Sequence, residues 1–179
     1  TDLALYEAKR SGKSTWRFSE AKSQMLAVEN MLLTQELRDA IRRGELALHY
    51  QPLVDIRSGR VTSFEALLRW KSPAYGNVPP NRFIPLAEES GSIREIGKWV
   101  LREACRFIRE LVARGNGDIS IAVNVSPRQL AADDFVTMVA DVMRQEGINP
   151  GQLELEITES VLIASVEDST RKLAQLRDL

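Results

Sequence analysis

Two residue types that commonly build catalytic and metal sites are almost missing from this sequence. It contains one histidine, His49, and one cysteine, Cys105, among 179 residues. A structural or catalytic zinc site takes several histidine or cysteine ligands, so the counts exclude such a site. A single cysteine also forms no internal disulfide, which is typical of proteins in a reducing compartment.

Long apolar runs and an excess of either charge are missing as well. No stretch approaches the roughly 18 apolar residues of a membrane helix, and no signal peptide is present. The 24 basic and 25 acidic residues give a formal net charge of −1. This balance provides no general attraction to a nucleic acid polymer or an anionic membrane. The composition, 44% hydrophobic and 27% charged, is that of a globular protein.

The first part of the chain is predicted to be mainly helical. A helix is expected over residues 2–10, and residues 14–18 ("STWRF") read as a short extended piece. A long helix is then expected from about Ser19 to Arg43, with Gly44 as its stop signal. Because the chain starts without methionine and stops within a helical pattern, we expect it to be an excerpt of a longer protein.

After Gly44 the pattern changes to strands and helices that alternate. Two strand-like segments joined by "RSGR" (57–60) predict a hairpin. Further strands are predicted in "DISIAVNVS" (118–126) and "QLELEITES" (152–160), with helical segments before and after each. Strands separated by helices predict parallel pairing, in either a barrel or a doubly wound sheet.

The segments between these strands are predicted as follows. Residues 72–83 read as a loop rich in proline and glycine, and residues 84–115 as helical, broken near Ser90 and Gly91. Ser126 is the expected cap of a helix that begins at Pro127 and continues to about residue 147.

Two charged residues stand out in the strand "SFEALLRW" (63–70). Alternation places Glu65 and Arg69 on one face, together with Ser63 and Leu67. The strand is otherwise apolar, so a carboxylate and a guanidinium on one face require an explanation. A structural ion pair and a functional site explain them equally well.

Each of three strands has a hard-oxygen side chain opposite its main apolar row. These residues are Glu65, Asn124 and Glu156. In a parallel barrel that face points inward, and polar groups near the strand C-termini form the active site. Two carboxylates and an amide suit Mg²⁺ or Mn²⁺. Turn and cap roles explain such residues at strand ends too, so both interpretations remain open at this stage.

The motifs around these residues resemble those of the EAL domains, bacterial phosphodiesterases that hydrolyse cyclic di-GMP. The resemblance covers residues from about 35 to 179. It rests on five motifs in the family's order, "YQP" (50–52), "FEALLRW" (64–70), "FIPLAEESG" (83–91), "NVSP" (124–127) and "LEITES" (155–160).

The resemblance also implies a domain organisation and a fold. Residues 1–20 resemble the last helix and strand of a GGDEF (diguanylate cyclase) domain, and residues 21–43 would be a linking helix. Residues 44–179 would be the N-terminal part of an EAL domain. The implied fold is α/β, a modified TIM-like (β/α) barrel with an antiparallel first strand, of which about half is present.

The resemblance assigns a role to each candidate residue. Three of them would be metal ligands, with Glu65 also catalytic: Glu65, Asn124 and Glu156. Another three would contact the dinucleotide, with Arg69 on a phosphate oxygen: Gln51, Leu67 and Arg69. Glu159 would serve catalysis without binding metal, by steadying a loop over the site.

The implied activity is metal-dependent hydrolysis of cyclic di-GMP to linear pGpG, with Mg²⁺ or Mn²⁺ as cofactor. The remaining family motifs would lie after Leu179, so we expect this chain alone to be inactive. The implied setting is cytoplasmic, and a membrane anchor of the parent protein would belong to a part outside this chain. The implied partner is a second copy, bound through the EAL domain or the linking helix.

Two other function classes remain open. One is an EAL module without catalysis that acts as a receptor for cyclic di-GMP, and the other is a signalling or dimerisation element in which the long helix relays a signal between domains. A glycosidase that uses Glu156 and Glu159 is disfavoured, because such enzymes place their carboxylates on either side of a sugar from separate segments.

Overall fold

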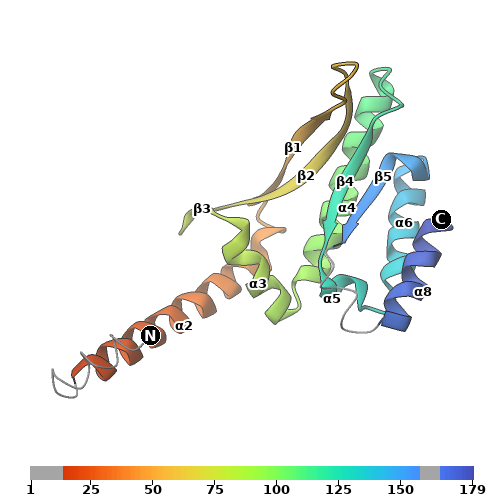
Figure 1. Ribbon diagram of the computed structural model, residues 1–179. Coiled ribbons are helices and arrows are strands. Elements are labelled where there is room, and N and C mark those ends of the chain that lie inside the picture. The colour runs from red at the N-terminus through yellow and green to blue at the C-terminus, as the bar shows by residue number, and fades with distance from the viewer. Residues whose placement is uncertain (1–13, 158–165) are drawn as a thin grey trace.

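The computed structural model describes residues 14–157 and 166–179, and its centre is a mixed sheet of five strands (Figure 1). The strands are β1 (Leu46–Val54), β2 (Val61–Ser72), β3 (Gly76–Val78), β4 (Ser120–Val125) and β5 (Leu153–Ile157). The helices are α2 (Ser14–Ala40), α3 (Pro80–Ser90), α4 (Ile93–Ala113), α5 (Pro127–Leu130), α6 (Phe135–Glu146), the 3₁₀ helix η1 (Pro150–Gln152) and α8 (Val166–Arg177).

The strand pairing confirms the predicted hairpin and the predicted parallel strands. The sheet order is β1-β2-β4-β5, with the short β3 paired to β2. β1 and β2 are antiparallel, whereas β2 pairs with β4, and β4 with β5, in parallel. Helices connect the parallel strands, as such crossovers require. The arrangement is that of part of a TIM-like barrel with an antiparallel first strand.

Three predicted segments were wrong in detail. The single helix expected from Pro127 to about residue 147 is divided into α5 and α6. Residues 14–18 are not extended, because they form the first turns of α2. No glycine or proline stands between residues 14 and 43, so a helix that has formed nearby propagates through residues of weak helix propensity. The predicted loop over 72–83 contains β3, and α3 starts within it at Pro80, a residue that suits a first helical turn.

The core lies between the apolar face of the parallel strands and the helices α4 and α6. Three buried side chains of β4 belong to it, Ile121, Val123 and Val125. Figure 1 shows α4 running behind the sheet, with α6 and α8 beside β5. Cys105 is buried in α4, and burial raises the pKa of its thiol to about 12. Burial and a raised pKa both disfavour the reactive thiolate form of this side chain.

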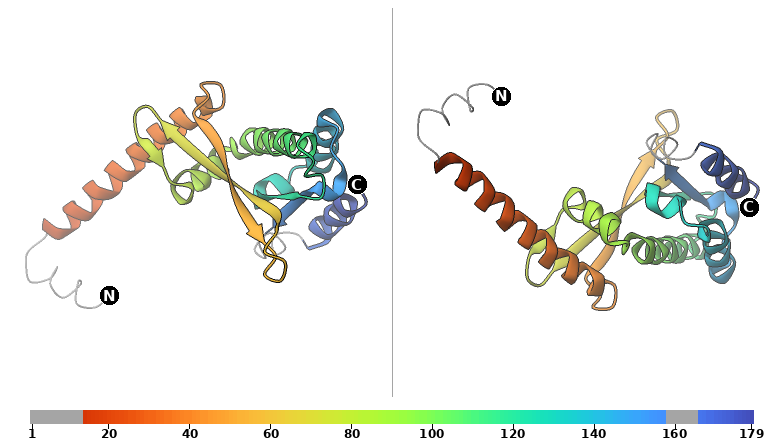
Figure 2. Two further views of the ribbon diagram at one scale, coloured as in Figure 1. Left: turned by 90° about the horizontal axis from the view of Figure 1, so that it is seen from above. Right: turned by 90° about the horizontal axis from the view of Figure 1, so that it is seen from below.

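The helix α2 extends away from the sheet and is attached to it at its C-terminal end (Figure 2). Leu33, Leu37 and Ala40 are buried there. Just beyond the helix, the buried Glu45 accepts a hydrogen bond of 3.0 Å from the indole Nε1 of Trp70, on β2. In the described part of the chain, no helix has the length and apolarity that crossing a membrane requires.

Candidate active site

The sheet register places Gln51, Glu65, Asn124 and Glu156 in a row across the neighbouring strands β1, β2, β4 and β5. Gln51 on β1 lies opposite Glu65 on β2, and Asn124 on β4 lies opposite Glu156 on β5. Glu65 itself aligns with Ala122 of β4, two residues before Asn124. Side chains two residues apart share a face, so the row stands on one side of the sheet.

Glu65 and Asn124 are in direct contact although 59 positions separate them in the sequence. The Asn124 Nδ2 donates a hydrogen bond of 2.8 Å to the Glu65 Oε1. The pair is open to solvent. A surface pair of this kind adds little to stability, so packing does not account for it.

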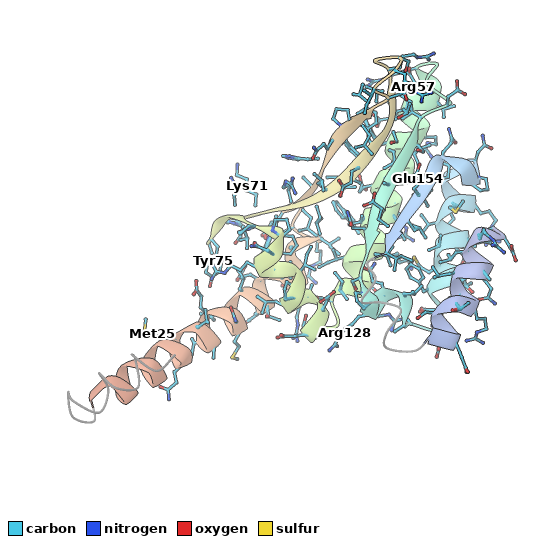
Figure 3. The ribbon with its side chains drawn as sticks, viewed as in Figure 1. Met25, Arg57, Lys71, Tyr75, Arg128 and Glu154 are labelled. Carbon is cyan, nitrogen blue, oxygen red and sulfur yellow. The ribbon has the colours of Figure 1, made fainter. Side chains whose placement is uncertain are left out.

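Glu156 experiences the negative charge of its neighbours. Its pKa is raised, first by burial and then by the carboxylates of Glu65 and Glu154. Glu154 occupies the same face of β5, and its Oε1 accepts a hydrogen bond of 2.5 Å from the Ser120 hydroxyl. Figure 3 labels Glu154 on β5, beside β4. The row therefore gathers negative charge that its own contacts leave uncompensated, which favours a cation.

The donor chemistry fits a hard divalent cation. Glu65, Asn124 and Glu156 offer carboxylate and amide oxygens, the ligands that Mg²⁺ and Mn²⁺ take. Among residues 14–157 and 166–179, no group of three or more histidine, cysteine or acidic side chains is placed so that it could hold a metal ion by itself. These three donors would therefore form part of a coordination sphere of about six oxygens.

The candidate substrate residues lie along the hairpin β1–β2. Gln51 is exposed, whereas Leu67 and Arg69 are half-buried. Arg69 Nη1 donates a hydrogen bond of 2.9 Å to the Leu68 carbonyl, and no other side-chain bond of Arg69 is seen within the described residues, which leaves donors for a ligand. Arg69 follows Glu65 by four residues, which is about 13 Å along a strand. The spacing suits a ligand of dinucleotide size.

Glu159, the remaining candidate, lies outside the described residues. The rest of its motif is described only as far as Ile157, the last residue of β5. Its role therefore stays a prediction.

A capping box that contains the buried Gln129 holds the chain just after Asn124. The Ser126 Oγ accepts a hydrogen bond from the Gln129 backbone, and the Gln129 Oε1 accepts one of 3.0 Å from the Ser126 backbone. The Gln129 amide lies directly over Gly97 of α4, where a Cβ would overlap it. The sequence indicated the Ser126 cap but not the role of Gln129, although glutamine three residues after a capping serine is its signature.

Comparison with protein families gives one assignment for most of the chain. The family model described as the EAL domain matches residues 34–179. This range contains every candidate residue described above.

Two curated relatives cover nearly the whole chain. The bifunctional diguanylate cyclase/cyclic di-GMP phosphodiesterase MucR of Pseudomonas aeruginosa is 41% identical over 175 residues, 98% of this chain and 26% of that protein. The cyclic di-GMP phosphodiesterase NbdA of the same organism is 37% identical over 177 residues, 99% of this chain and 23% of that protein. The chain thus spans about a quarter of these relatives.

A solved structure has the same fold. The PaMucR phosphodiesterase, in complex with c-di-GMP, is 41% identical and superposes with a TM-score of 0.79, over 82% of this chain and 60% of that one. The family match over more than half of the chain, with these relatives beside it, shows that the chain belongs to the EAL domain family.

Proposed function

We propose that the protein is a phosphodiesterase that hydrolyses cyclic di-GMP to linear pGpG. The observation that carries this proposal is the row of Glu65, Asn124 and Glu156 on one face of the sheet, with a direct contact across β2 and β4. Its support from related proteins is a c-di-GMP complex at 41% identity. Water adds across one P–O bond of the cyclic ligand, which opens the ring and leaves a terminal phosphate.

Phosphodiesterases of this family generally depend on a divalent metal ion. In this protein Glu65, Asn124 and Glu156 would hold the ion, and we propose Mg²⁺ or Mn²⁺. When bound, such an ion supplies Lewis acidity at a phosphoryl oxygen and lowers the pKa of water. Asn124 now donates to Glu65, and rotation of its amide would present an oxygen instead.

The other candidate residues bind and orient the substrate. Arg69 pairs with a phosphate oxygen, because its planar guanidinium offers several parallel donors. Gln51, exposed and opposite Glu65 in the register, has an amide that can bond a base or a ribose. Leu67 lies between Glu65 and Arg69 and offers an apolar surface to a base. Glu159 steadies the segment over the site, as the family resemblance implies.

The test is hydrolysis of cyclic di-GMP by the full-length protein, followed by chromatography of pGpG. We expect turnover that requires Mg²⁺ or Mn²⁺ and stops with EDTA. If the protein binds cyclic di-GMP but shows no turnover with either metal, it is a receptor rather than an enzyme. Absence of both binding and turnover would overturn the proposal altogether.

Two further predictions about the whole protein follow from the family resemblance. We expect a homodimer, which light scattering on the full-length protein would detect. A strict monomer at high concentration would contradict it. We also expect this part of the protein to lie in the cytoplasm. Fractionation of cells that produce the tagged protein would test this expectation.

A further inference from the structure

A buried ammonium group joins α8 to the end of α5. The side chain of Lys172 on α8 is only 4% exposed. Its Nζ donates hydrogen bonds of 3.0 Å each to the carbonyls of Leu130 and Ala131. The same Nζ lies 2.8 Å from the Asp168 Oδ2. An ammonium group has three N–H donors, so every one of them has an acceptor.

These two carbonyls lie at the point where α5 ends. The sequence predicted one helix from Pro127 to about residue 147, but α5 stops at Leu130 and α6 starts at Phe135. In a continuous helix the two carbonyls would accept from backbone N–H groups four residues later. Lys172 occupies them instead, and it places a positive charge at the carbonyl end of α5.

The other end of α5 is fixed as firmly. The capping box of Ser126 and Gln129 closes it, and Gln129 lies against Gly97 of α4. Asn124 stands two residues before Ser126, at the end of β4. Thus polar contacts hold α5 at both of its ends. The position of α5 in turn constrains the end of β4, the strand that contains Asn124.

Lys172 also connects the elements that follow the two neighbouring strands of the site. α5 follows β4, which contains Asn124, and α8 follows β5, which contains Glu156. Figure 1 shows α5 below the end of β4 and beside the lower end of α8. The strand ladder pairs Asn124 with Glu156 directly, and Lys172 provides a second link between their two helices.

We propose that Lys172, held by Asp168, is a positioning residue that sets Asn124 relative to Glu156. This inference rests on the proposed function, in which both residues hold a divalent ion. A stabilising role alone does not require a lysine here, since an apolar side chain of similar volume often replaces a buried ion pair without loss of stability. A positioning role does require it, because only the ammonium group bonds both carbonyls.

The experiment compares Lys172→Met with Arg171→Met in the full-length protein. Arg171 also pairs with Asp168 but is exposed, so its variant controls for the loss of a positive charge beside Asp168. Two readouts are measured, Mn²⁺ affinity by calorimetry and hydrogen exchange of the amides of residues 129–132. Asp168→Asn is a milder second variant, which leaves both carbonyl bonds of Lys172 in place.

We expect Lys172→Met to speed exchange in residues 129–132 and to weaken Mn²⁺ binding about three- to tenfold. That is less than the roughly 10- to 100-fold loss typical of residues that contact a metal ligand directly. Arg171→Met should change neither readout, and Asp168→Asn should fall between the native protein and Lys172→Met. Should Lys172→Met fail to fold, Lys172→Gln takes its place, because its neutral amide is one bond shorter and lacks the third donor of the ammonium group.

Native exchange rates and Mn²⁺ affinity in the Lys172→Met protein, or in Lys172→Gln where that variant decides, would overturn the positioning role. A different result would overturn the proposed metal site itself: a native protein that binds no Mn²⁺, or a Glu65→Gln variant that binds it with native affinity. The two failures are therefore distinguishable.

Discussion

The two faces of β4 differ in what their side chains contribute to the fold. Ile121, Val123 and Val125 point into the core and are almost fully buried, whereas Asn124 on the other face is exposed. The apolar face gains stability from every buried methylene. The polar face places Asn124 beside Glu65 and opposite Glu156, whose pKa is raised by burial and then by the neighbouring carboxylates. Exposed polar side chains that gather negative charge are explained by the ligand that this face binds.

The largest expected effect is on the polar face, with little loss of stability. Glu65→Gln keeps the volume and the acceptor for Asn124 but removes a negative metal ligand. We expect turnover of cyclic di-GMP to fall about a thousandfold, which is ~4 kcal/mol of transition-state stabilisation. The midpoint of thermal unfolding in EDTA should stay near the native value.

The matched control for this variant is Glu154→Gln. It removes the same charge from the same face, at a residue bonded to Ser120. Its turnover should stay within a few-fold of native. Equal losses from both variants would show that net charge, rather than a specific ligand, governs the activity.

The apolar face should show the opposite pattern. Ile121 is fully buried, so Ile121→Ala leaves a cavity and should lower the free energy of unfolding by about 2–5 kcal/mol. Turnover per folded molecule should remain close to native at low temperature. Urea denaturation with an activity assay checks both quantities. A variant with native stability would contradict the assignment of this face to the core.

Gly97 lies behind the polar face and tests the contact with Gln129. An added Cβ in Gly97→Ala would displace the buried Gln129 amide and break the capping box. We expect a loss of about 1–3 kcal/mol, typical of overpacked cores. Gly97→Ala combined with Gln129→Ala should recover part of that loss, because the overlapping amide is gone. A double variant less stable than either single one would contradict this explanation.

The smallest effect concerns Glu156, whose replacement should stabilise the protein rather than destabilise it. Its pKa in the folded protein is raised, so the ionised form is disfavoured by folding. This penalty is fully present above the folded pKa and disappears as pH falls below the unfolded value, about 4.3. In EDTA, Glu156→Gln should therefore unfold at a slightly higher temperature than the native protein at pH 7, and at the same temperature near pH 3.5. A lower midpoint at pH 7 would contradict it.

The sequence predicted the face of each site residue but not the contacts between them. Alternation along a strand fixes the side on which Glu65, Asn124 and Glu156 lie, because the pleat has a period of two. The register that brings Asn124 to Glu65 depends on how β2 and β4 pack, and no local pattern encodes that offset. The family motifs supplied the roles that geometry leaves open.

Local patterns failed where distant residues or cooperativity decide the structure. Residues 14–18 have weak helix propensity, yet they continue the helix that follows them. At the break between α5 and α6, Lys172, about 40 positions away, bonds the two carbonyls that a longer helix would use. Such a contact is visible only in the folded chain.

The most direct test of the account is a crystal structure of the full-length protein with Mn²⁺ and cyclic di-GMP, with the metal located by its anomalous scattering. We expect a peak at about 2.2 Å from oxygens of Glu65, Asn124 and Glu156, with a ligand phosphate beside it and Arg69 on that phosphate. A peak bound elsewhere, or a bound dinucleotide whose phosphates avoid this row, would contradict the central claim.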